Sequence, residues 1–435
     1  MAQECAYFRY SAHTRIILRM PTRVYYGWFV VAATFLTIVT TAGILTAPTM
    51  FILPMQAEFG WDARPISLAI GIQIALFGLT GPFAAAAMER FGVRRTIVSA
   101  LCLLAVAEFG VTFVTAAWQL PIWGAAVGLG AGSIALTFGA TIATRWFEQR
   151  RGLVIGIFSA GNATGALVFL PMFGQIIVHA GWRPCAYILS IVALAVIPVV
   201  LLVVRERPSD LGLPAFGATT VDTTLPPRVN PVRRAFATLN EATRSRTFWI
   251  LAGSFFICGA STNGLIGAHL VPACGDHGIP ETRAAGLLAA MGVFDLVGTT
   301  ASGWLSDRYS SRWLLFWYYG LRGLSLLFLP YAFGFGFLGL PIFAVFYGLD
   351  WIATVPPTVK LTASAFGRER APLFFGWIAA AHQLGAGLTA FVAGTLRSVV
   401  GSYNDAFLMS GLLCLIGAAL VLTIARRLAV IPARA

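Results

Sequence analysis

Twelve apolar stretches, each long enough to form a helix that crosses a lipid bilayer, recur along the 435 residues. A helix rises about 1.5 Å per residue, so about 20 residues cover a hydrocarbon core of ~30 Å. Only 11% of the residues are charged and 58% are hydrophobic, whereas about a quarter of a soluble globular chain is charged. Because a helix satisfies its own backbone hydrogen bonds inside lipid, we expect an all-α integral membrane protein with twelve transmembrane helices.

The expected spans form two sets of six. The first set covers 26–54, 65–87, 96–116, 120–144, 152–179 and 184–204, and the second covers 247–273, 284–306, 313–333, 338–363, 372–398 and 404–426. We therefore divide the chain into an N-terminal tail (1–24), a first bundle (25–204), a central loop (205–246), a second bundle (247–427) and a C-terminal tail (428–435). The loop predicts a short helix around Pro231–Thr243, and Pro356-Pro357 should break the span that contains them.

Basic residues lie mostly on one side of this topology. That side collects 25 of the 30, the other side holds four, and Arg322 lies inside a span. The positive-inside rule then places both tails and the central loop in the cytoplasm of a multi-pass protein of the cell (inner) membrane. The net charge of +13 reflects this topology, so we expect the lipid bilayer as a partner and no nucleic acid.

The N-terminal segment and the cysteines show no sign of a signal peptide or a metal site. The first 20 residues are polar and lack the apolar core of a signal peptide, so they form an extension or precede a natural start at Met20. The six cysteines are scattered without metal-ligand spacing, and no nucleotide-binding loop or catalytic arrangement is present. We expect no metal, no cofactor and no enzyme activity.

The two sets of spans repeat one another. Glu89 before the third span corresponds to Asp307 before the ninth, 218 residues later. Gly165-Ala166 corresponds to Gly385-Ala386 at an offset of 220, and the turn that begins at Gly181 corresponds to the turn at Gly401 at the same offset. Ordered matches at nearly one offset indicate two pseudo-symmetric six-helix bundles in parallel orientation.

The charged turns resemble the loop motif Gly-x-x-x-Asp-Arg-x-Gly-x-Arg-Arg of the major facilitator superfamily. The second copy begins Gly303-Trp304-Leu305-Ser306-Asp307-Arg308, and in the first copy Ala85 replaces Gly and Glu89 replaces Asp. The resemblance implies two halves that rock about a central site near the midplane, with a cytoplasmic gate in the motif. The gate residues would be Glu89, Arg90, Arg94, Asp307, Arg308, Arg312, Arg150 and Arg151. The alternative is that they only cap helices and set topology.

A finer resemblance is to the monocarboxylate and oxalate/formate transporter branch. It is carried by Arg145-Trp146-Phe147-Glu148-Gln149-Arg150-Arg151-Gly152, with glycines continuing to Gly165, and by Tyr26-Gly27-Trp28 and Arg205-Glu206-Arg207-Pro208. That branch often carries Asp followed four residues later by Arg in helix 8. Here Asp295 is followed by Thr299 in that place, which removes the group expected to hold a carboxylate.

Ionisable residues at membrane depth are costly and usually functional. Four lie near the middle of their expected spans in the second half, namely Asp295, Arg322, Asp350 and His382, whereas the first half offers only Glu108 at comparable depth. Together with Gln383 and with Asn162, which stands opposite His382 in the repeat, they are the candidates for substrate binding and proton coupling. The alternatives are a structural ion pair of Arg322 with Asp295 or Asp350, and plain interhelical hydrogen bonds from His382-Gln383.

These features favour a secondary active transporter. We expect it to move a small organic solute, first of all a carboxylate, by alternating access and proton-coupled symport, as a monomer. Proton-driven export of hydrophobic or cationic compounds is the alternative, and a non-transporting membrane sensor of the same fold ranks below it.

Overall fold

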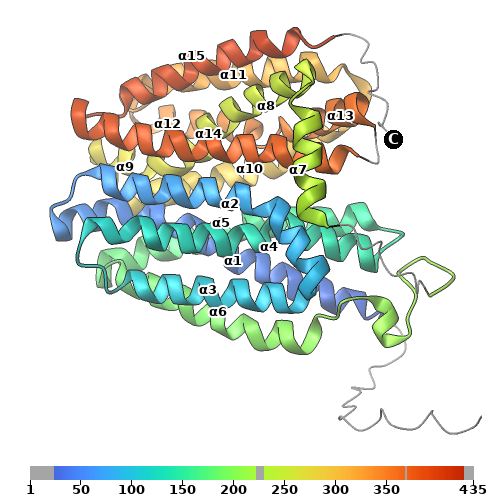
Figure 1. The fold of residues 1–435 in the computed structure, drawn as a ribbon. Helices are drawn as coiled ribbons and strands as arrows, with labels where there is room; N and C mark the ends of the chain where they lie inside the picture. The colour runs from blue at the N-terminus through green and yellow to red at the C-terminus, as the bar shows by residue number, and fades with distance from the viewer. Residues whose placement is uncertain (1–23, 222–229, 368–369, 426–435) are drawn as a thin grey trace, which may run out of the picture.

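The computed structural model describes residues 24–221, 230–367 and 370–425. Within these ranges the chain is helical apart from its connections and one isolated bridge between Phe147 and Phe216. Figure 1 shows the long helices running along one common direction, with the blue-to-green half of the chain below the yellow-to-red half. The expected all-α fold of two bundles is confirmed.

The first half forms six long helices. They are α1 (Gly27–Phe59), α2 (Ala63–Phe91), α3 (Val93–Val111), α4 (Leu120–Trp146), α5 (Arg151–Ala180) and α6 (Arg183–Val203), with the short η1 (Ala117–Gln119) before α4. Gly92 alone joins α2 to α3, with φ of 91°, and a Cβ there would lie 2.6 Å from the Glu206 carboxylate. Only glycine takes this backbone conformation without strain while leaving room for that carboxylate.

The second half has more interruptions. Its elements are α8 (Arg246–Gly259), η3 (Ala260–Gly267), α9 (Ala268–Asp276), α10 (Glu281–Arg308), α11 (Ser311–Ala332), α12 (Gly336–Asp350), α13 (Val355–Phe366), α14 (Ala371–Val400) and α15 (Asn404–Leu422). The consecutive α8, η3 and α9 form one span, of which η3 is a π-helix. The span made by α12 and α13 is broken directly before Pro356-Pro357, as the sequence predicts.

Nine helical segments in the described chain are long and apolar enough to cross a membrane. The other three of the expected twelve are α3, α11 and α14, with 19, 22 and 30 residues. Two of these helices carry buried ionisable residues, Glu108 on α3 and Arg322 on α11, which make them less apolar. In the described chain, α3 packs against α4 and α6, α11 packs against α15, and α14 packs against α2.

The halves meet where α2 packs against α14 and α5 against α10. At the α2–α14 crossing the backbones nearly touch, since a Cβ on Gly387 would lie 2.4 Å from the carbonyl oxygen of Gly71. Small residues allow such an approach between helices in lipid, where apolar side chains gain nothing by leaving the acyl chains. The contact between the halves therefore depends on the missing side chains at Gly71 and Gly387.

The segment after α6 folds back onto the first half. It contains the one-turn η2 (Pro208–Leu211), and Phe216 then pairs with the chain between α4 and α5: its N–H donates to Trp146 O at 2.8 Å. The Phe216 ring packs against Tyr25, Trp28 and Phe147. This part of the expected central loop is thus held by an aromatic cluster.

A short helix, α7 (Pro231–Ala242), then crosses the helix ends (Figure 1). Asn230 caps it, with Oδ1 accepting from Val232 N at 3.1 Å, and proline occupies the first turn, where no N–H is needed. Its Phe236 ring contacts Phe83 of α2 and Trp377 of α14, so α7 bridges the two halves. The predicted helix near Pro231–Thr243 is confirmed.

Replacing Gly387 by Val should separate α2 from α14. We expect the variant to lose about 1–3 kcal/mol of stability through overpacking, seen as a lower thermal unfolding temperature of the detergent-purified protein. Gly292→Ala on α10 is the matched control, because a Cβ there meets nothing within 4 Å. A Gly387→Val protein that unfolds at the wild-type temperature would contradict the tight crossing.

Candidate functional site

Three of the predicted site residues form one buried cluster in the second half. Arg322 on α11 is 1% exposed, Asp350 at the end of α12 is 6% exposed and Asp295 on α10 is 8% exposed. Such groups are tolerated away from water only when each charge has partners. The partners here are as much backbone as side chain, because the cluster surrounds the break between α12 and α13.

The break follows from two prolines. Pro356 and Pro357 have no N–H, so an unbroken helix would leave the carbonyls of Ile352 and Ala353 without donors. The helix stops at Asp350 and restarts at Val355. The backbone groups between them need partners from outside the helix.

Arg322 supplies most of the donors. Its Nε donates to Asp350 Oδ2 at 2.8 Å, and its Nη2 donates to the carbonyls of Asp350 and, at 3.1 Å, of Trp351. Its Nη1 donates to the Cys258 thiol of α8 at 2.8 Å. The planar guanidinium therefore caps α12 and neutralises its last side chain at once.

Residues of α10 complete the cap. Asp295 Oδ1 accepts from Ile352 N at 2.9 Å and from the Thr299 hydroxyl at 2.8 Å. The Ser302 hydroxyl donates to Ala353 O at 2.5 Å. Of the two possible partners, Arg322 forms its ion pair with Asp350, whereas Asp295 binds the backbone N–H of Ile352. Thr299 occupies the position where the monocarboxylate and oxalate/formate transporter branch often carries Arg, and its hydroxyl orients the Asp295 carboxylate.

His382 and Gln383 lie on α14 beside this cluster and are half-buried. The His382 ring packs against Phe255, 4.8 Å between centroids. The side chain of Gln383 packs against Gly78 of α2, and among the described residues its Oε1 has no hydrogen-bond partner. Asn162 is exposed on α5, and none of the described hydrogen bonds joins it to the cluster.

Two further features of the site, Cys258 and the π-helix η3, are not predicted from the sequence. Cys258 links the cluster to α8, with its Sγ 3.2 Å from the Thr354 hydroxyl as well as bonded to Arg322. The π-helix η3 follows directly, and Tyr347 of α12 donates to Ser261 O within it at 2.6 Å. The only signal was the glycines of this span: a Cβ on Gly259 would lie 1.8 Å from His382 O.

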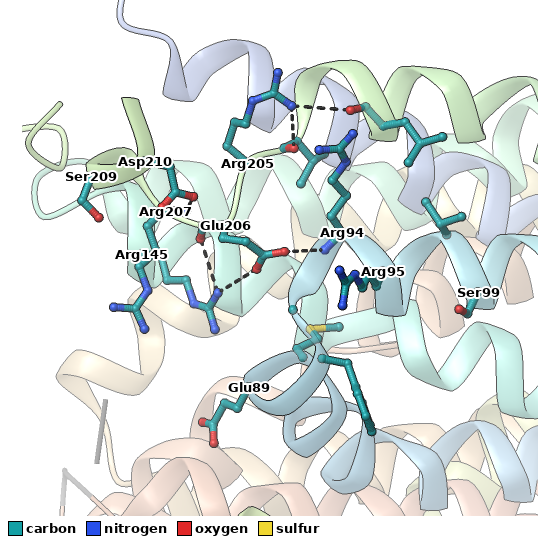
Figure 2. A pocket seen from close by; sticks show the side chains of 16 residues that line it. Glu89, Arg94, Arg95, Ser99, Arg145, Arg205, Glu206, Arg207, Ser209 and Asp210 are labelled. Atoms are coloured by element: carbon teal, nitrogen blue, oxygen red, sulfur yellow. Dashed lines mark hydrogen bonds and ion pairs between the residues drawn. The ribbon is translucent and has the colours of Figure 1, made fainter. Parts of the chain in front are cut away.

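The first gate motif lies at the turn between α2 and α3 and the second at the turn between α10 and α11. The end of the bundles that carries these turns is here called the arginine-rich end and is marked by Arg94, Arg145 and Arg312. The carboxylate that caps α3 is Glu206, from the segment after α6. It accepts from Val93 N at 2.8 Å and Arg94 N at 3.1 Å, and Arg145 of α4 lies 3.5 Å from it. Glu89 of the gate motif points away from Glu206 (Figure 2).

The remaining motif arginines contact aromatic rings or a backbone carbonyl. Arg90 stacks on Phe91, Arg308 on Trp304 at 3.8 Å and Arg150 on Phe216, and Arg312 donates to Ile424 O at 2.6 Å. Arg151 begins α5, but its side chain lies outside the described part. In the described chain, no ion pair joins Glu89 or Asp307 to an arginine.

Truncating Arg322 to Ala should be strongly destabilising, because it strands the Asp350 carboxylate and the carbonyls at the break. We expect a loss of about 3–5 kcal/mol, measured as a fall in thermal unfolding temperature. Adding Asp350→Asn should recover part of the loss, and exposed Arg283→Ala serves as control. If Arg322→Ala were as stable as the wild type, Arg322 would not be the cap described above.

Comparisons with known proteins agree with this architecture. The family model described as Major Facilitator Superfamily matches residues 30–349. Monocarboxylate transporter 13 of Bos taurus is 28% identical over 406 residues, which cover 92% of this chain and 89% of that protein. The uncharacterized MFS-type transporter YcxA of Bacillus subtilis is 26% identical over 396 residues, covering 86% and 90%.

A solved structure shares the fold. The bacterial homolog of the human lysosomal transporter Spinster, in an inward-facing and unoccupied conformation, matches with a TM-score of 0.72. The match covers 92% of this chain and 97% of that chain at 17% identity. Because the family model covers most of the chain and the relatives nearly all of it, this chain is a multi-pass membrane transporter of the Major Facilitator Superfamily.

Proposed function

We propose that this transporter carries a small carboxylate across the cell membrane by alternating access, in symport with protons and as a monomer. The observation that carries the proposal is the broken span α12–α13, whose free backbone is held by Arg322 and Asp295 beside the half-buried His382. The relatives named monocarboxylate transporters support the substrate class. The positive-inside rule places the arginine-rich end in the cytoplasm.

Alternating access is supported by different contacts at the two ends. At the end opposite the arginine-rich one, helices of the two halves touch directly: a Cβ on Gly275 of α9 would lie 2.6 Å from the Leu53 side chain of α1. A Cβ on Gly394 of α14 would likewise lie 2.0 Å from Ser67 Oγ of α2. At the arginine-rich end, α7 lies between α2 and α14. The halves would rock about the α2–α14 crossing, with the arginine-rich end as the side that opens.

Proton coupling is assigned to Asp295. As a carboxylate, it accepts a charge-assisted hydrogen bond from the backbone N–H of Ile352, and this bond ties α10 to the break. A proton on Asp295 removes the charge and weakens the tie, so that α13 can tilt relative to α12. Asp350 instead pairs with Arg322, whose other donors point to two carbonyls.

Substrate recognition is assigned to α14. Thr299 brings no positive charge, and the guanidinium of Arg322 is occupied by protein groups, so neither provides the cation that a carboxylate needs. A protonated His382 supplies that charge, and the adjacent Gln383 supplies amide donors. Asn162, 220 residues before His382 and exposed on α5, is the corresponding polar group of the first half.

The first test is uptake by proteoliposomes. We expect an inward proton gradient to drive accumulation of small labelled monocarboxylates, and Asp295→Asn to abolish that drive while carboxylate exchange without a gradient continues. Asn keeps an oxygen for Ile352 N but cannot take up a proton. The control is Asp405→Asn, an exposed acid on α15. Unchanged proton-driven uptake by Asp295→Asn would refute the coupling assignment.

The second test addresses recognition. His382→Gln should raise the KM for the carboxylate about 10- to 100-fold, the loss expected for one hydrogen bond to a charged group. The exposed His179→Gln on α5 should leave KM unchanged. If wild-type vesicles moved no carboxylate but expelled a hydrophobic cation against a proton gradient, the protein would be an exporter instead.

A further inference from the structure

A recess of about 1150 Å³ opens on the first half at the arginine-rich end. It lies between the end of α2, the start of α3, the end of α6 and the segment that follows α6. It is separate from the cluster around Arg322, which belongs to the second half. Figure 2 shows its polar side chains gathered around Glu206.

Its lining carries more positive than negative charge. Five arginines (94, 95, 145, 205 and 207) and three acids (Glu89, Glu206 and Asp210) line it. Two of the acids already have partners within the protein. Glu206 caps α3 and pairs with Arg145, and Asp210 accepts from the backbone N–H of Arg207 at 3.0 Å. Glu89 points away from Glu206 (Figure 2).

Three guanidinium groups are left for a ligand. In the described chain no carboxylate lies within ion-pair distance of Arg94, Arg95 or Arg205. Arg205 donates only weakly, at 3.5 and 3.4 Å, to the carbonyls of Leu201 and Val204. Ser99 adds a hydroxyl to the lining. Forked guanidinium donors of this kind match the oxygens of a phosphate group.

The rest of the wall is apolar and continues toward lipid. Phe91 is 57% exposed and Leu201 is 38% exposed, and Val98 also lines the recess. The next residue after Leu201, Leu202, is 71% exposed. α3 and α6 form the outer edge of the first half (Figure 1), where a bilayer would meet the protein. A polar anion needs no such wall, whereas a lipid with an acyl chain does.

We propose that this recess binds the phosphate headgroup of an anionic phospholipid, with Arg94, Arg95 and Arg205 around the phosphate and an acyl chain along α3 and α6. The lipid would fill the space between α3 and the segment after α6, next to the Glu206 cap. Its binding would therefore stabilise the arginine-rich end of the first half.

Thermal unfolding of the detergent-purified transporter tests this site. Added phosphatidylglycerol should raise the unfolding temperature, while phosphatidylcholine of the same chain length should not. Arg94→Gln/Arg95→Gln should lose at least half of the rise and unfold near the wild-type temperature without lipid, since neither side chain bonds within the described protein. The matched control is Arg233→Gln/Arg234→Gln, which removes the same charge from exposed positions on α7.

A third arm separates the two sources of phosphate. Inorganic phosphate and glycerol phosphate, at the same concentration as the lipid, should give no comparable rise. An equal rise with either of them would overturn the lipid assignment in favour of a soluble anion. Equal effects of the two phospholipids, or an undiminished rise in Arg94→Gln/Arg95→Gln, would overturn the site itself.

Discussion

The guanidinium of Arg322 and the interrupted helix beside it depend on each other. A buried positive charge needs acceptors, and a helix that stops inside a membrane leaves carbonyls that need donors. Arg322 meets both needs, because its donors reach the Asp350 carboxylate, two carbonyls at the break and the Cys258 thiol. Asp295 likewise accepts from the N–H of Ile352, and Ser302 donates to the carbonyl of Ala353. As a result, α8, α10, α11 and the α12–α13 span are joined at one point.

This arrangement changes how the buried charges are interpreted. Taken alone, an Asp–Arg pair at membrane depth suggests a substrate or proton site. Here two of the four hydrogen bonds of Arg322 end on backbone carbonyls at the break, so the pair is also a helix cap. A cap at a break can still take part in transport, because a change in its charge alters how firmly two half-helices are held together. The proposed division of labour follows: Asp295 senses the proton, and α14 meets the substrate.

In the two halves, helix ends are capped by side chains of opposite charge. In the first half, an acidic side chain, Glu206, binds the N–H groups at the start of α3. In the second half, a basic side chain, Arg312 at the start of α11, binds the carbonyl of Ile424 after α15. Each choice suits the helix dipole of the end that it meets. Among the described residues, the neighbouring Arg94 and Arg95 have no carboxylate within ion-pair distance and are available to an external anion.

The sequence by itself determined the class of protein, the all-helical fold, the helix near Pro231–Thr243 and the break before Pro356-Pro357. These depend on local properties: the length of an apolar run, the spacing of a motif and the missing N–H of proline. It also located Asp295, Arg322 and Asp350, because charge inside an apolar run stands out. Tertiary structure decided which partner each of them takes. It also decided that Glu206 rather than Glu89 caps α3, and that Cys258 joins the cluster, because side chains from distant spans meet only after the helices have packed.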